Sequence, residues 1–298
     1  MISQVNSLII SKPKAVLTKN NTSFYGQAVS IPLEQKDGKD VVAINKKSKL
    51  SKKQKTWIKI GTVVATVAAI AVTAREIFIK KAQKVFQEAF LRDDINRKET
   101  INILNRYREV AKIKDKNEYI KAVYEEGKKN FGLKNLNLKL SISKMDKKNV
   151  VGSYNSTKAL LKINEEMHRK DVIDTLHHEL RHVKQDFLMA NYSPKEFASA
   201  KMWASGGLYQ LQSNNERSIE AVYTCYFNNH GITRDPSVVP QKLEDYVKKL
   251  IKAQRDYVES NIVDGKINQE YYNNFKEVDA RKCGESIDRI LKWIKFWK

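Results

Sequence analysis

The chain has 298 residues with 41% hydrophobic and 9% aromatic content, and its formal net charge at pH 7 is +21. This composition excludes an intrinsically disordered chain, and the presence of only two cysteines excludes a fold held by a disulfide framework. Lysine far outnumbers arginine. Because bidentate recognition of bases and phosphates favours arginine, nucleic acid is not predicted as the main partner despite the basic charge.

The first 55 residues are polar and lysine-rich, and they show neither a helical nor an alternating hydrophobic period. The stretch 46–59, KKSKLSKKQKTWIK, contains no acidic residue. Segments of this composition cannot bury enough apolar surface to offset the entropy lost on ordering. Residues 1–55 are therefore predicted to be a disordered basic tail.

A hydrophobic helix is predicted over residues 56–75. The stretch 60–74 carries no charge, and Trp57 and Ile58 extend it beyond a single lysine. A membrane-spanning helix needs roughly 17–25 apolar residues, and a lysine near its end can reach the interface. Residues 57–74 are predicted to associate with a membrane as a single-pass anchor. A helix buried in protein and a cleaved export signal are the alternatives.

The charges that flank this anchor predict its orientation. More lysines precede the apolar stretch than basic residues follow it. The positive-inside rule then places the N-terminus in the cytoplasm and the rest of the chain outside. A soluble or exported protein is the alternative localisation.

The remainder of the chain is predicted to be helical apart from two short strands. Residues 76–114 are interpreted as a helical linker region and 115–298 as one domain. Leucine and isoleucine alternate with polar residues over 136–142, which predicts a strand, and a second strand is predicted over 159–163. Further helices are predicted near 171–189, 215–229, 240–260, 267–280 and 285–297.

Three of the five histidines lie within six residues of one predicted helix, around a glutamate. The sequence His178-Glu179-Leu180-Arg181-His182 has the pattern H-E-x-x-H. Two imidazoles one helical turn apart can bind one metal ion. Glu179 lies about 100° around the helix from His178, where it can reach a water in the open coordination position. We therefore predict His178 and His182 as metal ligands and Glu179 as the catalytic base.

The other side of the H-E-x-x-H helix is apolar. Leu176, Leu180, Val183 and Phe187 recur at the helical period and form one stripe. The helix is therefore predicted to pack on the core with this stripe and to face a cleft with its histidine pair.

A tetrahedral catalytic zinc site requires a third protein ligand. The helix predicted near 215–229 carries Glu216 and Glu220 one turn apart on a shared face, with small side chains on the other side. Glu220 is predicted as the third metal ligand. Glu216 is the alternative ligand, or a partner for one of the ligand histidines.

The order of strand, edge strand, H-E-x-x-H helix and glutamate-bearing helix resembles the zincin metallopeptidases in their glutamate-ligand (gluzincin) arrangement. The resemblance covers about residues 115–230. It implies a zincin-like α+β fold, in which a small antiparallel or mixed sheet packs on the active-site helix and the C-terminal part is mostly helical. In that family the strand before the active-site helix binds extended peptide, and residues 156–164 hold its place in the sequence.

The resemblance also implies a cofactor and its ligands. Zn²⁺ would be bound by His178, His182 and Glu220, with Glu179 as the base. Arg181 departs from the small or uncharged residue common at its position, and the Gly-x-x-His extension of the metzincins does not follow His182.

The sequence as a whole predicts a zinc-dependent endopeptidase that acts on peptide or protein substrates. A membrane-associated binding protein with an inactive or structural zinc site is the alternative, and a basic nucleic-acid-binding module is a third hypothesis. The side chain that would stabilise the oxyanion stays open among five candidates. These are His177, Tyr209, Tyr223, Tyr226 and His230.

Overall fold

The computed structural model describes residues 51–145, 150–204, 216–256 and 269–293. The chain divides into two units, Met1–Thr56 and Trp57–Lys298. The predicted basic tail falls in the first unit and lies almost entirely outside the described residues. All contacts reported below belong to the second unit.

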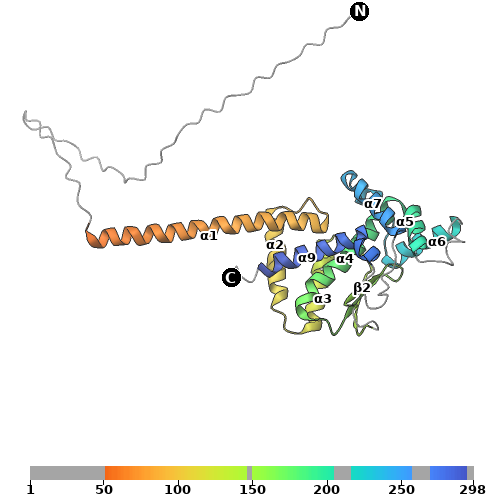
Figure 1. The fold of residues 1–298 in the computed structure, drawn as a ribbon, viewed down its shortest axis with the longest axis horizontal. Coiled ribbons are helices and arrows are strands. Elements are labelled where there is room, and N and C mark those ends of the chain that lie inside the picture. Colours follow the sequence, from red (N-terminus) through yellow and green to blue (C-terminus); the bar gives the residue numbers. More distant parts are fainter. Residues whose placement is uncertain (1–50, 146–149, 205–215, 257–268, 294–298) are drawn as a thin grey trace, which may run out of the picture. The chain divides into compact units, whose positions relative to one another are not determined.

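The described part of the chain is mostly helical and contains one small sheet (Figure 1). The elements that matter for the site follow in chain order. They are α1 (Lys52–Phe90), α2 (Arg97–Ala111), α3 (Lys116–Asn130), β1 (Lys139–Ser143), β2 (Gly152–Asn155), β3 (Leu160–Asn164), α4 (Val172–Tyr192), α5 (Pro194–Ala204), α6 (Glu216–His230), α7 (Glu244–Arg255), α8 (Gln269–Asn273) and α9 (Phe275–Trp293). The coarse prediction of a small mixed sheet among helices, with an N-terminal apolar helix, is confirmed.

The sheet has the strand order β1-β3-β2. β1 pairs with β3 in parallel, and β2 pairs with β3 in the antiparallel direction, with Tyr154 opposite Leu161. Both predicted strands therefore exist, but the proposed place of residues 156–164 at the sheet edge is wrong. β3 lies in the centre of the sheet, with β1 at one edge and the short strand β2, which the sequence did not predict, at the other.

The apolar stretch and the start of the predicted linker belong to one continuous helix, α1. Its N-terminal part is exposed, and the helix is long and apolar enough to cross a membrane, with none of its most apolar window buried. Its C-terminal part is buried through Ile79, Ala82, Phe86, Ala89 and Phe90. The described residues thus do not cover the apolar stretch.

Residues 76–114, predicted to be a linker region, contribute to the main hydrophobic core instead. Phe86 and Phe90 of α1 and Ile103 and Tyr107 of α2 are buried in the same cluster as Leu176 of α4. The physical reason is the spacing of apolar residues three and four apart in α2, which gives this helix a face that has to be covered.

The first histidine of the cluster, His177, is a core residue. Its side chain is fully buried, its Nδ1 atom lies 2.7 Å from the carbonyl oxygen of Ile173, and its Nε2 atom lies 2.6 Å from the hydroxyl of Tyr107. Burial lowers the pKa of His177 to about 4. Nδ1 therefore carries the proton and donates to the carbonyl, while Nε2 accepts from the Tyr107 hydroxyl. Since both ring nitrogens are engaged in the core, His177 has no donor left to stabilise an oxyanion.

We expect Tyr107→Phe to destabilise the protein by about 1–3 kcal/mol, because it leaves the Nε2 atom of the buried imidazole without its donor. Urea unfolding measures this change. Tyr272→Phe is the matched control, since the Tyr272 side chain is 43% exposed, and surface substitutions stay within about 0.5 kcal/mol. An equal effect of both substitutions would show that the buried hydrogen bond contributes nothing.

Candidate metal centre

α4 carries the two predicted histidine ligands. Leu176, Leu180 and Val183 are fully buried, as the apolar stripe predicted. His178 and His182 lie on another side of the helix with 19% and 12% of their side chains exposed. The packing of α4 on the core therefore presents both imidazoles together at a partly open position.

α9 supplies a carboxylate to this pair. The Glu277 side chain is 1% exposed, its Oε1 atom lies 3.2 Å from Nε2 of His182, and its Oε2 atom lies 3.5 Å from Nε2 of His178. The two Nε2 atoms are 3.1 Å apart. Two nitrogens and one carboxylate thus converge on a common point, and this group of three can hold a metal ion.

The spacing of these atoms fits a tetrahedral ion. Zinc binds imidazole nitrogen and carboxylate oxygen at about 2.0–2.2 Å, which places neighbouring ligand atoms of a tetrahedron about 3.3 Å apart. The two Nε2 atoms are 3.1 Å apart and His182 Nε2 lies 3.2 Å from Oε1 of Glu277, while His178 Nε2 faces the other carboxylate oxygen, Oε2, at 3.5 Å. The side chains of His178, His182 and Glu277 are therefore close enough to bind one metal ion through one ligand atom each.

Glu220, the predicted third ligand, is not part of this group. It lies on α6 with an exposed side chain, and the alternative Glu216, 89% exposed, lies 3.6 Å from Lys195. α6 packs on α5 and contributes Tyr226 and Phe227 to a second hydrophobic cluster. The structure brings Glu277, and not Glu220, to the histidine pair, because α9 and not α6 packs along α4.

A signal for Glu277 was present in the sequence. Glu277, Ala280, Gly284 and Ile287 recur at helical spacing, and all four are buried in α9. Small residues on such a stripe permit a close approach of two helices. The sequence was instead divided into two helices near Gly284, whereas α9 continues through this residue.

Gly284 allows the close approach of α9 to α4. A Cβ atom added there would lie 2.5 Å from the backbone carbonyl oxygen of Asp174, and no side-chain rotation can relieve that overlap. We expect Gly284→Ala to destabilise the fold by about 1–3 kcal/mol and to weaken metal binding, because it pushes Glu277 away from the histidines.

Thermal unfolding and zinc titration measure these two effects. Gly61→Ala serves as the control, because a Cβ at this exposed position of α1 meets nothing within 4 Å. Zinc affinity equal to that of the unsubstituted chain in Gly284→Ala would contradict this account of α9 placement.

Gln185 fixes the tautomer of His182. Its Oε1 atom lies 2.9 Å from Nδ1 of His182, and its Nε2 atom donates to the Lys276 carbonyl at 3.1 Å and to Asp279 at 2.8 Å. Nδ1 of His182 therefore carries the proton, which leaves Nε2 as the metal-binding atom. The same amide connects the histidine on α4 to the backbone beside Glu277.

Arg181, the departure from the zincin pattern, joins three helices. Its guanidinium donates to both carboxylate oxygens of Asp279 at 2.6 and 2.9 Å and to the carbonyl of Ala89 at 2.6 Å. Burial opposes ionisation of Asp279, but Arg181 outweighs it and lowers the pKa of that carboxyl. The charged Arg181 thus fits inside the H-E-x-x-H motif because it binds Asp279, two residues after Glu277, and so anchors α9 to α4.

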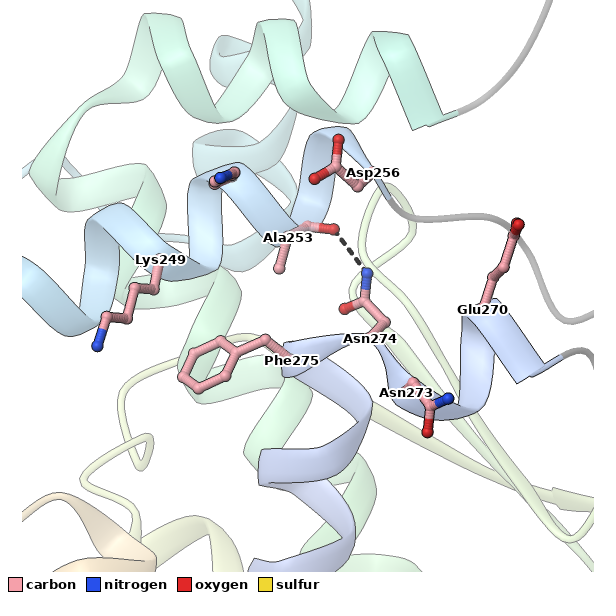
Figure 2. Close-up of a pocket in the computed structure, with 8 residues that line it drawn as sticks. Lys249, Ala253, Asp256, Glu270, Asn273, Asn274 and Phe275 are labelled. Atoms are coloured by element: carbon pink, nitrogen blue, oxygen red, sulfur yellow. Dashed lines mark hydrogen bonds between the residues drawn. The ribbon is translucent and has the colours of Figure 1, made fainter.

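The start of α9 is held by further polar contacts. The Asn274 amide donates to the Ala253 carbonyl at 2.9 Å, and Nζ of Lys276 lies 3.1 Å from Oδ1 of the buried Asp186 of α4. Figure 2 shows the hollow beside Asn274, between α7 and the α8–α9 junction. None of the residues that line it belongs to the metal group. They are Lys249, Lys252, Ala253, Asp256, Glu270, Asn273, Asn274 and Phe275.

The carboxyl groups of Glu277 and Glu179 have different electrostatic environments. Burial acts to raise the pKa of Glu277, but the two adjacent imidazoles outweigh it and hold this pKa well below its usual value. Burial raises the pKa of Glu179 to about 7, and the negative charge of Glu277 acts in the same direction. Glu277 is therefore suited to bind a cation, and Glu179 to exchange a proton.

The edge strand β2 lies directly against Glu179. A backbone hydrogen bond joins Tyr154 to the Glu179 carboxylate. A Cβ on Gly152 would lie 2.6 Å from Thr175 Cγ2 and 3.3 Å from Glu179 Oε1. A glycine is needed for this approach, which places the edge strand directly against the Glu179 side chain.

The other candidate oxyanion stabilisers are placed as follows. Tyr226 and His230 are buried, and His230 Nε2 accepts from the Tyr154 hydroxyl at 2.9 Å while its Nδ1 faces the Tyr226 carbonyl at 2.8 Å. Tyr223 packs on the second hydrophobic cluster, and Tyr209 lies outside the described residues. The sequence did not suggest Tyr154. Its hydroxyl connects the edge strand β2 with His230 of α6.

No family model, curated protein or solved structure matches the chain. The functional argument therefore depends on the geometry and chemistry of the metal group and its surroundings.

Proposed function

We propose that this chain is a membrane-anchored, zinc-dependent endopeptidase with a zincin-like arrangement of its site. The observation that carries the proposal is the convergence of His178, His182 and Glu277 within 3.5 Å of one another, with the buried Glu179 beside them on the same helix turn. A structural zinc site is usually closed by four protein ligands. Three ligands and an adjacent carboxylate fit a catalytic site better.

The donor set supports zinc as the metal. Two imidazoles and one carboxylate are a common ligand set of hydrolytic zinc sites, and they leave one coordination position for water. His178, His182 and Glu277 would hold the zinc, which would supply a water of lowered pKa and polarise the scissile carbonyl. Gln185 holds the His182 ring in the tautomer that this binding requires.

Glu179 acts as the general base in this proposal. Its carboxylate is held by the Tyr154 backbone, and a pKa of about 7 lets it accept a proton from water and return it to the leaving amine near neutral pH. The surroundings of this carboxylate exclude most bulk water, since the Glu179 side chain is 7% exposed overall.

The free edge of β2 is an argument for a polypeptide as the substrate. In the described sheet β2 pairs only with β3, and apart from the Tyr154 backbone group that binds Glu179 its other side can pair with an extended chain. This edge runs past Glu179, where Gly152 and Tyr154 contact the carboxylate. A peptide added to β2 would bring its backbone next to the base and the metal group.

Chelation tests the function. We expect the purified full chain to hydrolyse casein, to lose this activity with 1,10-phenanthroline, and to regain it when one equivalent of zinc is added. Fragment release and metal content by mass spectrometry are the measurements. Hydrolysis that persists in metal-free protein would refute the proposal, and bound zinc without hydrolysis of any unfolded protein would favour a binding protein instead. Any shortened chain used here has to retain Ile79–Phe90, which belongs to the core.

A further inference from the structure

α1 connects the apolar stretch to the catalytic core without an interruption. The helix runs from Lys52 to Phe90 and contains no proline. Its one glycine, Gly61, lies within the apolar stretch and not between that stretch and the core. Sharp bends in helices occur at prolines, glycine and serine pairs or bulges. The segment between Ala74 and Ile79 has none of these residues and forms a rigid connection.

The core holds the C-terminal end of α1 firmly. Phe86 and Phe90 are fully buried, and the Phe90 ring packs edge-on against Phe131, the residue that follows α3, with centroids 5.0 Å apart. Near the middle of the helix, Glu76 pairs with Arg97 of α2 at 2.5 Å. Several contacts spread over four helical turns thus prevent α1 from pivoting on the core.

Arg181 links this helix directly to the metal group. Its guanidinium binds the Ala89 carbonyl at the end of α1, and Arg181 itself lies between His178 and His182 in the sequence. It also binds Asp279, two residues after Glu277. The metal group is therefore fixed relative to the last turn of α1.

The length of α1 sets the distance between the bilayer and the metal group. At 1.5 Å per residue, the 57–74 stretch is about 27 Å long, close to the roughly 30 Å of a hydrocarbon core. From Ala74 to Ala89 the helix rises about 22 Å more. With α1 near the membrane normal, the metal group lies roughly 20–30 Å from the end of the span.

We propose that the substrates are polypeptides tethered to the same bilayer and cleaved within about 30 Å of its surface. This inference rests on the proposed endopeptidase function and on the anchor. An extended chain advances about 3.3 Å per residue, so cleavage falls roughly six to ten residues from the substrate's own span. Tethering raises the effective concentration of such segments at this height, while chains without a tether have no such advantage.

The first experiment varies the height of the peptide bond. The full chain is reconstituted in phosphatidylcholine nanodiscs with a single-span substrate that carries the same unfolded tether on both sides. The tether repeats one short segment that the enzyme cleaves in soluble form, so that every height offers identical bonds. We expect mass spectrometry to find cleavage concentrated in the repeats nearest the bilayer, within about 30 Å.

The second experiment changes the length of α1. Seven helix-forming residues inserted between Ala74 and Arg75 add about 10 Å and nearly two full turns, which preserves the orientation of the core. Cleavage is expected to move outward by about three residues. The matched control inserts the same residues between Ser51 and Lys52, on the other side of the apolar stretch, and leaves the cleavage position unchanged.

A third measurement does not depend on catalysis. Cys225 is an exposed thiol of α6, whereas Cys283 is buried, so a fluorescent donor can be attached to Cys225 alone. Energy transfer to acceptors on lipid headgroups is expected to fall with the insertion after Ala74 and to stay constant with the control insertion.

Cleavage spread evenly along the tether, or an unchanged cleavage position with the longer α1, would overturn the inference while leaving the endopeptidase intact. Energy transfer that does not respond to the insertion would also overturn it. Absence of cleavage of every substrate, the soluble peptide included, would refute the proposed function itself.

Discussion

Glu179→Gln is expected to keep its zinc and to lose peptide hydrolysis by about 10²- to 10⁴-fold in kcat. The substitution preserves the size of the side chain and an oxygen that can accept the Tyr154 backbone hydrogen bond, but it removes the group that takes a proton from water. Turnover of a fluorogenic peptide and metal content by mass spectrometry measure the two properties separately.

Glu220→Gln is the matched control for this experiment. Glu220 is an exposed glutamate of α6 outside the metal group, so its change to glutamine is expected to alter neither zinc content nor turnover. Undiminished hydrolysis by Glu179→Gln would show that this carboxylate is not the base. Loss of zinc from Glu179→Gln would instead show that Glu179 supports metal binding.

Glu277→Gln is expected to weaken zinc binding by more than the roughly 10- to 100-fold that loss of an outer supporting group costs. The substitution removes the only negative charge among the three metal-binding side chains, although the amide occupies nearly the same volume. At a zinc concentration 1,000 times its Kd, the unsubstituted chain gains about 4.1 kcal/mol of stability. A 100-fold weaker variant gains about 1.4 kcal/mol at the same concentration.

The shift in unfolding free energy on zinc addition measures this difference. The apo forms of the two chains provide the reference, since Glu277 is buried and its substitution can itself change stability. Glu220→Gln again serves as the control and is expected to show the full gain. The reverse result would be zinc that stabilises Glu277→Gln fully but does not stabilise Glu220→Gln. It would show that Glu220, as the sequence suggested, is the third ligand.

The hydrogen bonds of Arg181 and Gln185 hold the helices that carry His178, His182 and Glu277 in fixed relative positions. Both side chains bind Asp279, so the helix that carries the histidines and the helix that carries Glu277 share one carboxylate. Residues placed to orient metal ligands are typically supported in this way by neighbouring hydrogen bonds. The positions of α4 and α9 are thereby coupled to the end of α1.

The sequence predicted well what depends on neighbours in the chain. The pairing of His178 and His182 on one side of a helix follows from the 3.6-residue period, as does the buried stripe that contains Leu180. The alternation around β1 and the apolar length of α1 are equally local properties.

Other predictions failed because the deciding contacts join distant segments. Glu220 and Glu277 are both glutamates on helices that follow α4, and no local pattern shows which helix packs along it. β2 was missed because four residues, GSYN, carry too little alternation to signal a strand. The interpretation of 76–114 as a linker overlooked a buried face whose partner is the core around His177.

The sequence by itself determined that two imidazoles and a glutamate share one helix turn, because helical geometry fixes the positions of residues one to four apart. Only the tertiary structure decided that Glu277 lies against the histidine pair, that β2 forms the sheet edge beside Glu179, and that the C-terminal part of α1 belongs to the core. These depend on which apolar faces find one another across the chain, and that choice is made by packing of the whole core rather than by any short stretch.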